Sequence, residues 1–192
     1  MTLGAADAGI LRRRARVVPA VDASTRQLIA DMVVTMRGSH GVGLAAPQIG
    51  VPLRVLVAGS RQPPLALINP RLERRWGRQL GPEGCLSIPG IYADVRRAQH
   101  VVVTGQNARG RSITVRAGGL LSRVLQHEID HLNGVLFIDR VSPDQLVRRL
   151  RPPRAARRRS AAGVAADGHR AIEVKTVLRH RRAHRQQVRR IS

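Results

Sequence analysis

One short segment, RVLQHEIDHLNG at residues 123–134, restricts the fold of this chain more than any other. His127 and His131 are four residues apart, so on a helix they lie on one face, one turn apart, and both imidazoles can reach one metal ion. Apolar residues recur at helical spacing, and Gly134 is a helix stop. The segment therefore predicts a helix over residues 118–134. Its predicted apolar side consists of Leu121, Val124, Leu125, Ile129 and Leu132.

The residue after the first histidine is a glutamate with a different role. Glu128 points about 100° around the helix from His127, so it is better placed to touch a metal-bound water than to bind the metal. A carboxylate there can take a proton from the water and later hand it to a leaving amine. The same motif also occurs by chance in helices, where two histidines need bind nothing. Asp130 is interpreted as a solvated helix residue.

Two histidines leave a catalytic metal site one protein ligand short. In the zinc-protease pattern H-E-x-x-H-x-x-G-x-x-H the last position holds Phe137, which cannot bind a metal. The downstream carboxylates are Asp139, which can equally pair with an arginine, and Glu173 in a basic tail. Upstream, Cys85 in PEGCLSIPG is the outstanding candidate, although a lone cysteine is most often a buried apolar residue. A thiolate, two imidazoles and an open fourth position suit Fe(II), Zn(II), Ni(II) or Co(II).

The remaining pattern indicates an α+β domain with mostly antiparallel β-sheets packed around the helix that carries H-E-x-x-H. A helix is predicted in DASTRQLIADMVVTMRGSHG, with Ser24 or Thr25 as its cap and Gly38 at its end. GVGLAAPQIGVP is predicted as a loop or a distorted edge. A third helix is predicted in SPDQLVRRL, capped by Ser142. Four strands are predicted, at residues 53–59, 65–72, 100–106 and 112–117.

The charge divides the chain into two parts. Lys and Arg number 34 against 12 Asp and Glu, a formal net charge of +22. Residues 151–192 hold 13 Arg and Lys against 2 acids, half of that excess in 42 residues. A domain over residues 1–150 and an Arg-rich extension over 151–192 are therefore predicted, with a basic amphipathic helix in residues 171–191. The extension suits RNA, a ribosome or an acidic membrane surface, or it is a solvated, disordered tail.

Other compositional features limit the class of protein. No run of some 18 apolar residues occurs, so no transmembrane helix is expected. A single cysteine cannot form an internal disulfide, which suits the reducing cytosol. The arginines at residues 12–16 follow a weakly apolar stretch, unlike a secretory signal, although an organellar transit segment is a second interpretation. One Trp, one Tyr and one Phe argue against a dedicated single-strand binder.

Three short motifs follow one another along the chain: GVGLAAPQIG at residues 41–50, EGCLS at 83–87 and QHEIDHLNG at 126–134. With them the chain resembles the peptide deformylase family, whose pattern is G-x-G-L-A-A-x-Q, then E-G-C-L-S, then Q-H-E-x-D-H-L-x-G. The resemblance covers about residues 10 to 150. It implies removal of the formyl group from the N-terminal formyl-methionine of nascent chains, with release of formate.

The resemblance also implies roles for individual residues. Cys85, His127 and His131 would hold one divalent metal ion, Fe(II) being the expected physiological ion and Zn, Ni or Co alternatives. Glu128 would be the general acid/base. Gln48 would hydrogen-bond the metal-bound water and the developing oxyanion, and the backbone N–H of Leu86 would support that oxygen. These roles agree with the chemistry, because fixed donors aimed at an amide oxygen that gains charge lower the barrier.

Substrate contacts and partners are further expectations. The small residues of GVGLAA let an extended strand run beside a peptide, with Val42 and Gly43 as candidate contacts, although these glycines can equally serve a tight turn. Val124 and Leu125 are candidates for the apolar methionine pocket or for the core. The family is thought to work beside the ribosomal exit tunnel, so the tail is expected to bind ribosomal RNA. The alternatives are a zinc endopeptidase and a basic RNA-binding protein with a degenerate metal site.

Overall fold

The computed structural model describes residues 8–59, 63–148 and 173–176. Its helices are α1 (Ala8–Leu11), α2 (Ala23–Gly38) and α3 (Gly119–Leu132), with 3₁₀ turns η1 (Ala46–Ile49), η2 (Phe137–Arg140) and η3 (Pro143–Gln145). The strands are β1 (Gly43–Ala45), β2 (Val55–Ala58), β3 (Leu65–Trp76), β4 (Gln79–Cys85), β5 (Ile88–Arg97), β6 (His100–Gln106), β7 (Ser112–Gly118), β8 (Val147–Arg148) and β9 (Glu173–Thr176).

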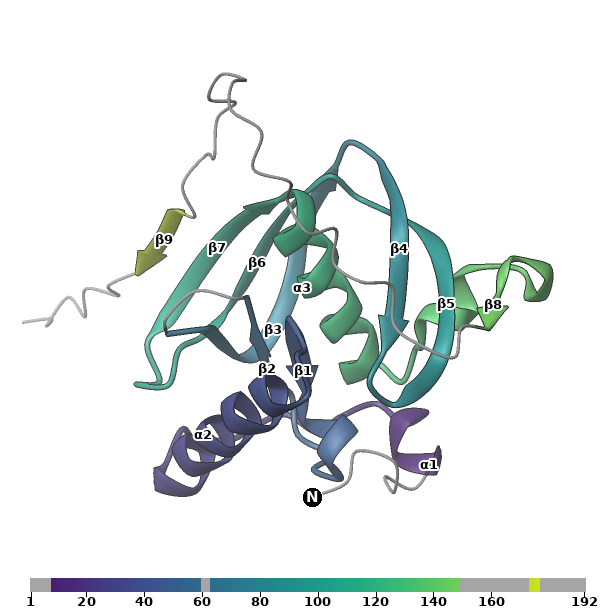
Figure 1. Ribbon diagram of the computed structural model, residues 1–192. Helices are drawn as coiled ribbons and strands as arrows, with labels where there is room; N and C mark the ends of the chain where they lie inside the picture. The colour runs from purple at the N-terminus through teal and green to yellow at the C-terminus, as the bar shows by residue number, and fades with distance from the viewer. Residues whose placement is uncertain (1–7, 60–62, 149–172, 177–192) are drawn as a thin grey trace, which may run out of the picture.

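Two antiparallel sheets form the body of the molecule. One has six strands in the order β1-β2-β3-β6-β7-β9, and the other has three in the order β4-β5-β8. Helix α3 lies between the two sheets, and α2 packs against β1 and β2 (Figure 1). The predicted α+β class with antiparallel sheets is confirmed. None of the helices in the described part of the chain has the length and apolarity needed to span a bilayer.

Helix α3 is buried along most of its length. Leu125, Ile129 and Leu132 belong to a core cluster with residues of the large sheet, as their helical spacing predicts. The helix ends where predicted, because Gly134 adopts a left-handed φ of 77° just beyond it. A Cβ at this glycine would lie 2.6 Å from the carbonyl oxygen of Arg12, so only glycine lets the N-terminal segment approach so closely.

A buried arginine holds the C-terminal end of α3 to the sheet. The Arg54 guanidinium donates to the carbonyl oxygen of Leu132 at 3.0 Å and to the side chain of Asn133 at 3.0 Å. It also donates to the carbonyl oxygen of Pro70 at 3.3 Å. A cation at this end satisfies carbonyls that the helix leaves free and suits the helix dipole. Helix α3 is thus fixed in position at the end nearest His131.

The N-terminal cap of α2 differs from the prediction. Asp22, rather than Ser24 or Thr25, caps the helix: its carboxylate accepts from the backbone N–H of Thr25 at 2.8 Å. The predicted hydroxyls lie two and three residues too late, because the helix already begins at Ala23. This backbone hydrogen bond, with those from the Ser24 and Thr25 hydroxyls, lowers the pKa of Asp22 to about 2. The predicted end at Gly38 is confirmed.

Two predicted helices are wrong. The segment after Ser142 forms only the 3₁₀ turn η3 and then β8, which pairs with Ile91 and Tyr92 of β5. The N–H of the predicted cap, Ser142, donates to the side chain of Gln145 at 3.1 Å. The helix predicted over residues 171–191 is contradicted at residues 173–176, where β9 pairs with β7. In both places the segment pairs with the free edge of a neighbouring strand, and these hydrogen bonds outweigh its local helix propensity. The rest of residues 171–191 lies outside the described residues.

The hairpin of β4 and β5 was not predicted. Gly81, Pro82 and Gly84 interrupt the β pattern of residues 79–85. Within the described residues β4 pairs only with β5, so it is an edge strand, where a proline that cannot donate to the ladder is tolerated. Strand β3 also continues past its predicted end to Trp76, through register shifts that carry it beyond Pro70. The hairpin stands beside α3 (Figure 1), and the Sγ of Cys85 at the end of β4 lies within 4.8 Å of the ligand atoms of His127 and His131.

Candidate metal centre

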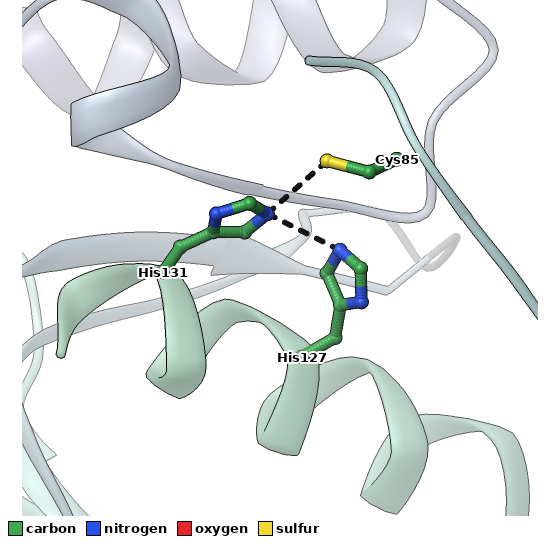
Figure 2. Close-up of side chains that lie close together, drawn as sticks. All are labelled: Cys85, His127 and His131. Atoms are coloured by element: carbon green, nitrogen blue, oxygen red, sulfur yellow. Dashed lines mark hydrogen bonds between the residues drawn. The ribbon is translucent and has the colours of Figure 1, made fainter. Parts of the chain in front are cut away.

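The three side chains proposed as ligands lie together. The Sγ of Cys85 is 3.2 Å from Nε2 of His131, and that atom is 3.2 Å from Nε2 of His127 (Figure 2). One ligand atom from each residue lies within 4.8 Å of the others. The histidines come from successive turns of α3 and the cysteine from the end of β4. Among the described residues this is the one Cys/His/Asp/Glu group that could hold a metal ion.

The donor set fits a divalent transition metal. Two imidazole nitrogens, each about 2.0–2.1 Å from a tetrahedral ion, lie about 3.3 Å apart, close to the separation of the two Nε2 atoms. A soft thiolate with two imidazoles suits Fe(II), Zn(II), Ni(II) or Co(II). Three protein ligands leave a fourth position open, as in catalytic rather than structural sites.

A buried glutamate orients the first histidine. Glu83 Oε2 lies 3.0 Å from Nδ1 of His127, so the Nδ1–H points to the carboxylate and Nε2 faces Cys85 and His131. Such a partner fixes the tautomer of a metal-binding histidine and raises its basicity. Burial opposes the charge on Glu83, but hydrogen bonds from Arg97 and His127 lower its pKa to about 2. The carboxylate is therefore ionised at neutral pH.

Glu83 belongs to a buried network of charges. Arg97 donates to both of its oxygens at 2.9 Å, and Arg123 donates to Oε1 at 2.8 Å. The expectation that Asp130 is solvated is wrong, because it is 7% exposed and paired with Arg97 and Arg140. Arg97 of β5 and Arg140 of η2 contact this carboxylate, and the helix sequence alone does not show them.

Glu128 points into a cavity beside the cluster. The cavity measures about 700 Å³, and Cys85, His127 and Glu128 all line it. Glu128 is 4% exposed, and its Oε2 has no hydrogen-bond partner within the described part of the chain. Burial, which disfavours the charged form, raises its pKa to about 7. A carboxyl with a pKa near neutrality can both accept and donate a proton.

Gln48 is held with its amino group toward Cys85. Its Oε1 accepts from the backbone N–H of Ala45 at 2.8 Å, which fixes the orientation of the amide. Its Nε2 lies 3.5 Å from the Sγ of Cys85 and 3.3 Å from the Oγ of Ser87. The side chain is 2% exposed and lines the cavity. Gln48 therefore presents a fixed N–H donor, as expected of a residue that does not titrate.

The other predicted site residues divide between the cavity and the core. Val42, Gly43, Leu86 and Val124 line the cavity. Leu125, the second candidate for an apolar pocket, is 0% exposed and belongs to the core cluster of α3. Val124 belongs to the same core cluster but also reaches the cavity, whereas Leu125 does not, since adjacent helix residues point in different directions.

The residues considered as downstream ligands are placed elsewhere. Phe137 is 1% exposed, packs with Ala93 and Val95, and stacks on the His127 ring with centroids 6.2 Å apart. Asp139 forms an ion pair with Arg12 at 2.5 Å. Glu173 lies in β9, and the structure does not describe its side chain.

A family comparison covers most of the chain. The family model described as "Polypeptide deformylase" matches residues 2–146. The chain belongs to this family. Peptide deformylases are also its relatives in pairwise comparison: that of Thermomicrobium roseum is 48% identical over 147 residues, which cover 72% of this chain and 84% of the relative. That of Dictyoglomus thermophilum is 44% identical over 137 residues, covering 71% and 90%.

Solved deformylase structures share the fold. The structure from Legionella pneumophila is 42% identical, has a TM-score of 0.71, and matches over 76% of this chain and 87% of its own. The Synechococcus elongatus structure, in complex with actinonin, is 48% identical, has a TM-score of 0.67, and matches over 69% and 74%. The expectation that the chain is a deformylase-type enzyme is confirmed, whereas the family match ends before the Arg-rich extension.

Sequence reasoning missed the polar network behind this deformylase site. Glu83 lies two residues before Cys85 in β4, within the motif that carries the cysteine. Arg123, His127 and Asp130 recur at spacings of four and three, so a second, polar face of α3 was visible in the sequence. Arg97 has no such signal, because only the sheet brings it to the helix.

Proposed function

We propose that this chain is a metal-dependent hydrolase that removes the formyl group from the N-terminal formyl-methionine of nascent polypeptides and releases formate. Family membership supports the reaction class. The observation that carries the mechanism is the cluster of Cys85, His127 and His131 with Glu128 in the same cavity. The donor set favours one divalent ion, and we propose Fe(II), with Zn, Ni or Co as substitutes.

The metal would act as a Lewis acid, polarising the formyl oxygen and lowering the pKa of water. Glu128 then moves the proton. Its carboxylate accepts a proton from the attacking water as the new C–O bond forms at the formyl carbon. It donates that proton to the methionine nitrogen as the C–N bond breaks, leaving formate and a free amine. Its burial and raised pKa suit both steps.

Two N–H donors would stabilise the oxygen that gains charge. The Nε2 of Gln48 already faces Cys85, so it needs no reorientation during the reaction. The backbone N–H of Leu86, the residue after Cys85 on the rim of the cavity, is the proposed second donor. Donors fixed in advance lower a barrier more than donors that must rearrange.

The substrate peptide would lie beside β1. Among the described residues this strand pairs only with β2, so its other edge is available for an extended peptide at Val42 and Gly43, which line the cavity. The methionine side chain would contact Val124, which supplies apolar surface on the α3 side of the cavity.

Substituting Gly43→Ala is expected to reduce turnover about 100-fold, because a displacement of about 1 Å at a reacting group has that effect. The added Cβ would lie 2.4 Å from Oε1 of Glu128 and 2.6 Å from Cγ1 of Val124. The carboxylate must move, since valine is stiff. Gly38→Ala is the matched control, with no atom within 4 Å. Wild-type kcat/KM in the Gly43 variant would contradict this account of the close approach.

Formate release from formyl-Met-Ala, with Fe(II) or Ni(II) loaded anaerobically, tests the proposed reaction. Formate is expected only with metal, and the unformylated dipeptide should remain intact. Cleavage of unformylated peptides would favour a zinc endopeptidase. Polynucleotide binding without formate release or metal binding would favour an RNA-binding protein with a degenerate site. Anaerobic handling matters because thiolate ligands and Fe(II) oxidise readily.

The charge distribution supports a second part of the proposal. We assign catalysis to residues 1–150 and ribosomal RNA binding to residues 151–192, which contain 13 Arg and Lys but only 2 Asp and Glu. The reaction is placed in the cytoplasm, where reducing conditions keep a lone thiolate available. Deleting residues 151–192 should leave turnover of formyl-Met-Ala intact and weaken co-sedimentation with ribosomes at low salt. Unchanged co-sedimentation would contradict the assignment.

A further inference from the structure

A second cavity, of about 610 Å³, is lined by residues of α3 other than those that line the catalytic cavity. It shares no lining residue with the catalytic cavity. Its lining residues come from β3, the β3–β4 turn, the end of β5, η2 and α3. A cavity of this size suits a small ligand or a short piece of an extended polymer. We call it the arginine groove.

The rim of the arginine groove carries unneutralised positive charge. Arg75, Arg78 and Arg96 line it and are exposed. None of the three has an ion pair within the described part of the chain, whereas the other two lining arginines, buried Arg97 and exposed Arg140, are paired with Asp130. Three guanidiniums around one cavity attract an anion with several charges, and their planar forks match phosphate oxygens.

The only tryptophan of the sequence stands in the same groove. Trp76 is 47% exposed, and its ring stacks on His100 with centroids 5.3 Å apart. The chain has only three Phe, Trp and Tyr residues, so the exposure of the largest of them, instead of its burial in the core, is unusual. Of the other two, Phe137 is buried and Tyr92 lines the catalytic cavity. An aromatic face beside arginines is the arrangement that binds a nucleobase together with its phosphates.

A closely packed turn and side-chain hydrogen bonds to the backbone hold the walls of the groove in place. Gly77, with a left-handed φ of 67°, lets the β3–β4 turn approach Gln99 so closely that a Cβ would lie 2.9 Å from its side chain. Gln126 of α3 accepts from the Ala98 N–H at 3.1 Å and donates to its carbonyl at 3.0 Å. Gln79 donates to the same carbonyl at 2.9 Å. The backbone of the β5–β6 turn is therefore fixed to α3, and Gln79 joins the start of β4 to it.

From these observations we propose that the arginine groove binds single-stranded RNA, with a base stacked on Trp76 and backbone phosphates on Arg75, Arg78 and Arg96. The charge alone would also suit an acidic peptide, but the exposed ring beside it favours a nucleotide. The scarcity of aromatic residues excludes a long stacking platform, so the site holds one base and its adjacent phosphates. This binding is independent of formyl hydrolysis and of residues 151–192.

Fluorescence of the single tryptophan tests the proposal on the full chain, because the Arg-rich extension contains no tryptophan and its binding is silent. A 12-nucleotide oligouridylate is expected to quench Trp76 in a saturable manner. With three phosphate contacts, its affinity should fall about 20-fold between 50 and 200 mM NaCl. The double substitution Arg78→Gln with Arg96→Gln should weaken the quenching about tenfold, because two of the three phosphate contacts are removed.

The matched control is Arg109→Gln with Arg111→Gln, which removes the same charge from the exposed β6–β7 turn at the other end of the sheet. It should leave the quenching unchanged, and both double variants should keep formate release, since neither touches the catalytic cavity. Equal weakening by the two double variants would overturn the proposal. Oligouridylate binding without quenching, or equal quenching by poly-glutamate, which has no bases, would overturn it as well.

Discussion

The substitution Glu128→Gln is expected to lower kcat/KM for formate release by about 10²–10⁴-fold, the usual contribution of a positioned acid/base. Glutamine keeps the shape of the side chain in a site where Glu128 is 4% exposed, but it cannot accept a proton. The bound metal should be unchanged, because Cys85, His127 and His131 remain. The measurements are formate release and metal content after anaerobic loading.

A matched substitution separates this effect from general damage. Glu73→Gln makes the same change at an exposed position of β3, whose carboxylate accepts from the Thr104 hydroxyl at 2.6 Å. It should retain wild-type activity. Full activity in the Glu128 variant would show that another group transfers the proton. Loss of metal from that variant would show that the glutamate has a structural role at the centre.

The largest effect on stability is expected from Glu83→Gln. The change removes the negative charge that Arg97 and Arg123 share in a site where the glutamate side chain is 4% exposed. Leaving buried cations without their partner costs about 3–5 kcal/mol. The free energy of unfolding, from denaturant titration of the metal-free protein, should fall by that amount. The same variant should lose about 10–100-fold in metal affinity, because Glu83 orients His127.

Glu73→Gln serves again as the comparison, since loss of one exposed hydrogen bond should change the free energy of unfolding by less than about 1 kcal/mol. The two readouts for Glu83 are independent. A destabilised variant with wild-type metal affinity would assign the network to folding alone. A loss of unfolding free energy below about 1 kcal/mol would contradict the buried-network interpretation.

The site was predictable to the extent that local spacing determined it. Two histidines four residues apart share a face of any helix, so α3 and its imidazoles followed from the period of the helix alone. Cys85 was the outstanding candidate for the third position, Asp139 stayed open as an alternative, and the resemblance to the family assigned the cysteine. The aspartate between the histidines was misjudged, because solvation depends on what covers that face of α3, and Arg97 and Arg140 come from elsewhere in the chain.

The secondary structure shows the same contrast between features that local sequence determines and features that depend on the rest of the fold. The strands at residues 100–106 and 112–117 were predicted because β-branched residues recur there, and the structure has them as β6 and β7. The hairpin of β4 and β5 was missed because its glycines and proline hide the pattern. The segment after Ser142 became a turn and a strand because the edge of β5 was free to pair with it.

By itself, the sequence determined which residues have the chemistry for a metal centre, which faces of α2 and α3 are apolar, and which family the motifs resemble. Only the tertiary structure decided that Glu83 supports His127, that Asp130 is buried, and that Trp76 stands among exposed arginines. The physical reason is that the periodicity of a helix or a strand involves only a few neighbouring residues, so a short segment of sequence shows it. Burial, and the pairing of charges that burial requires, depends on segments that meet only when the two sheets close around α3.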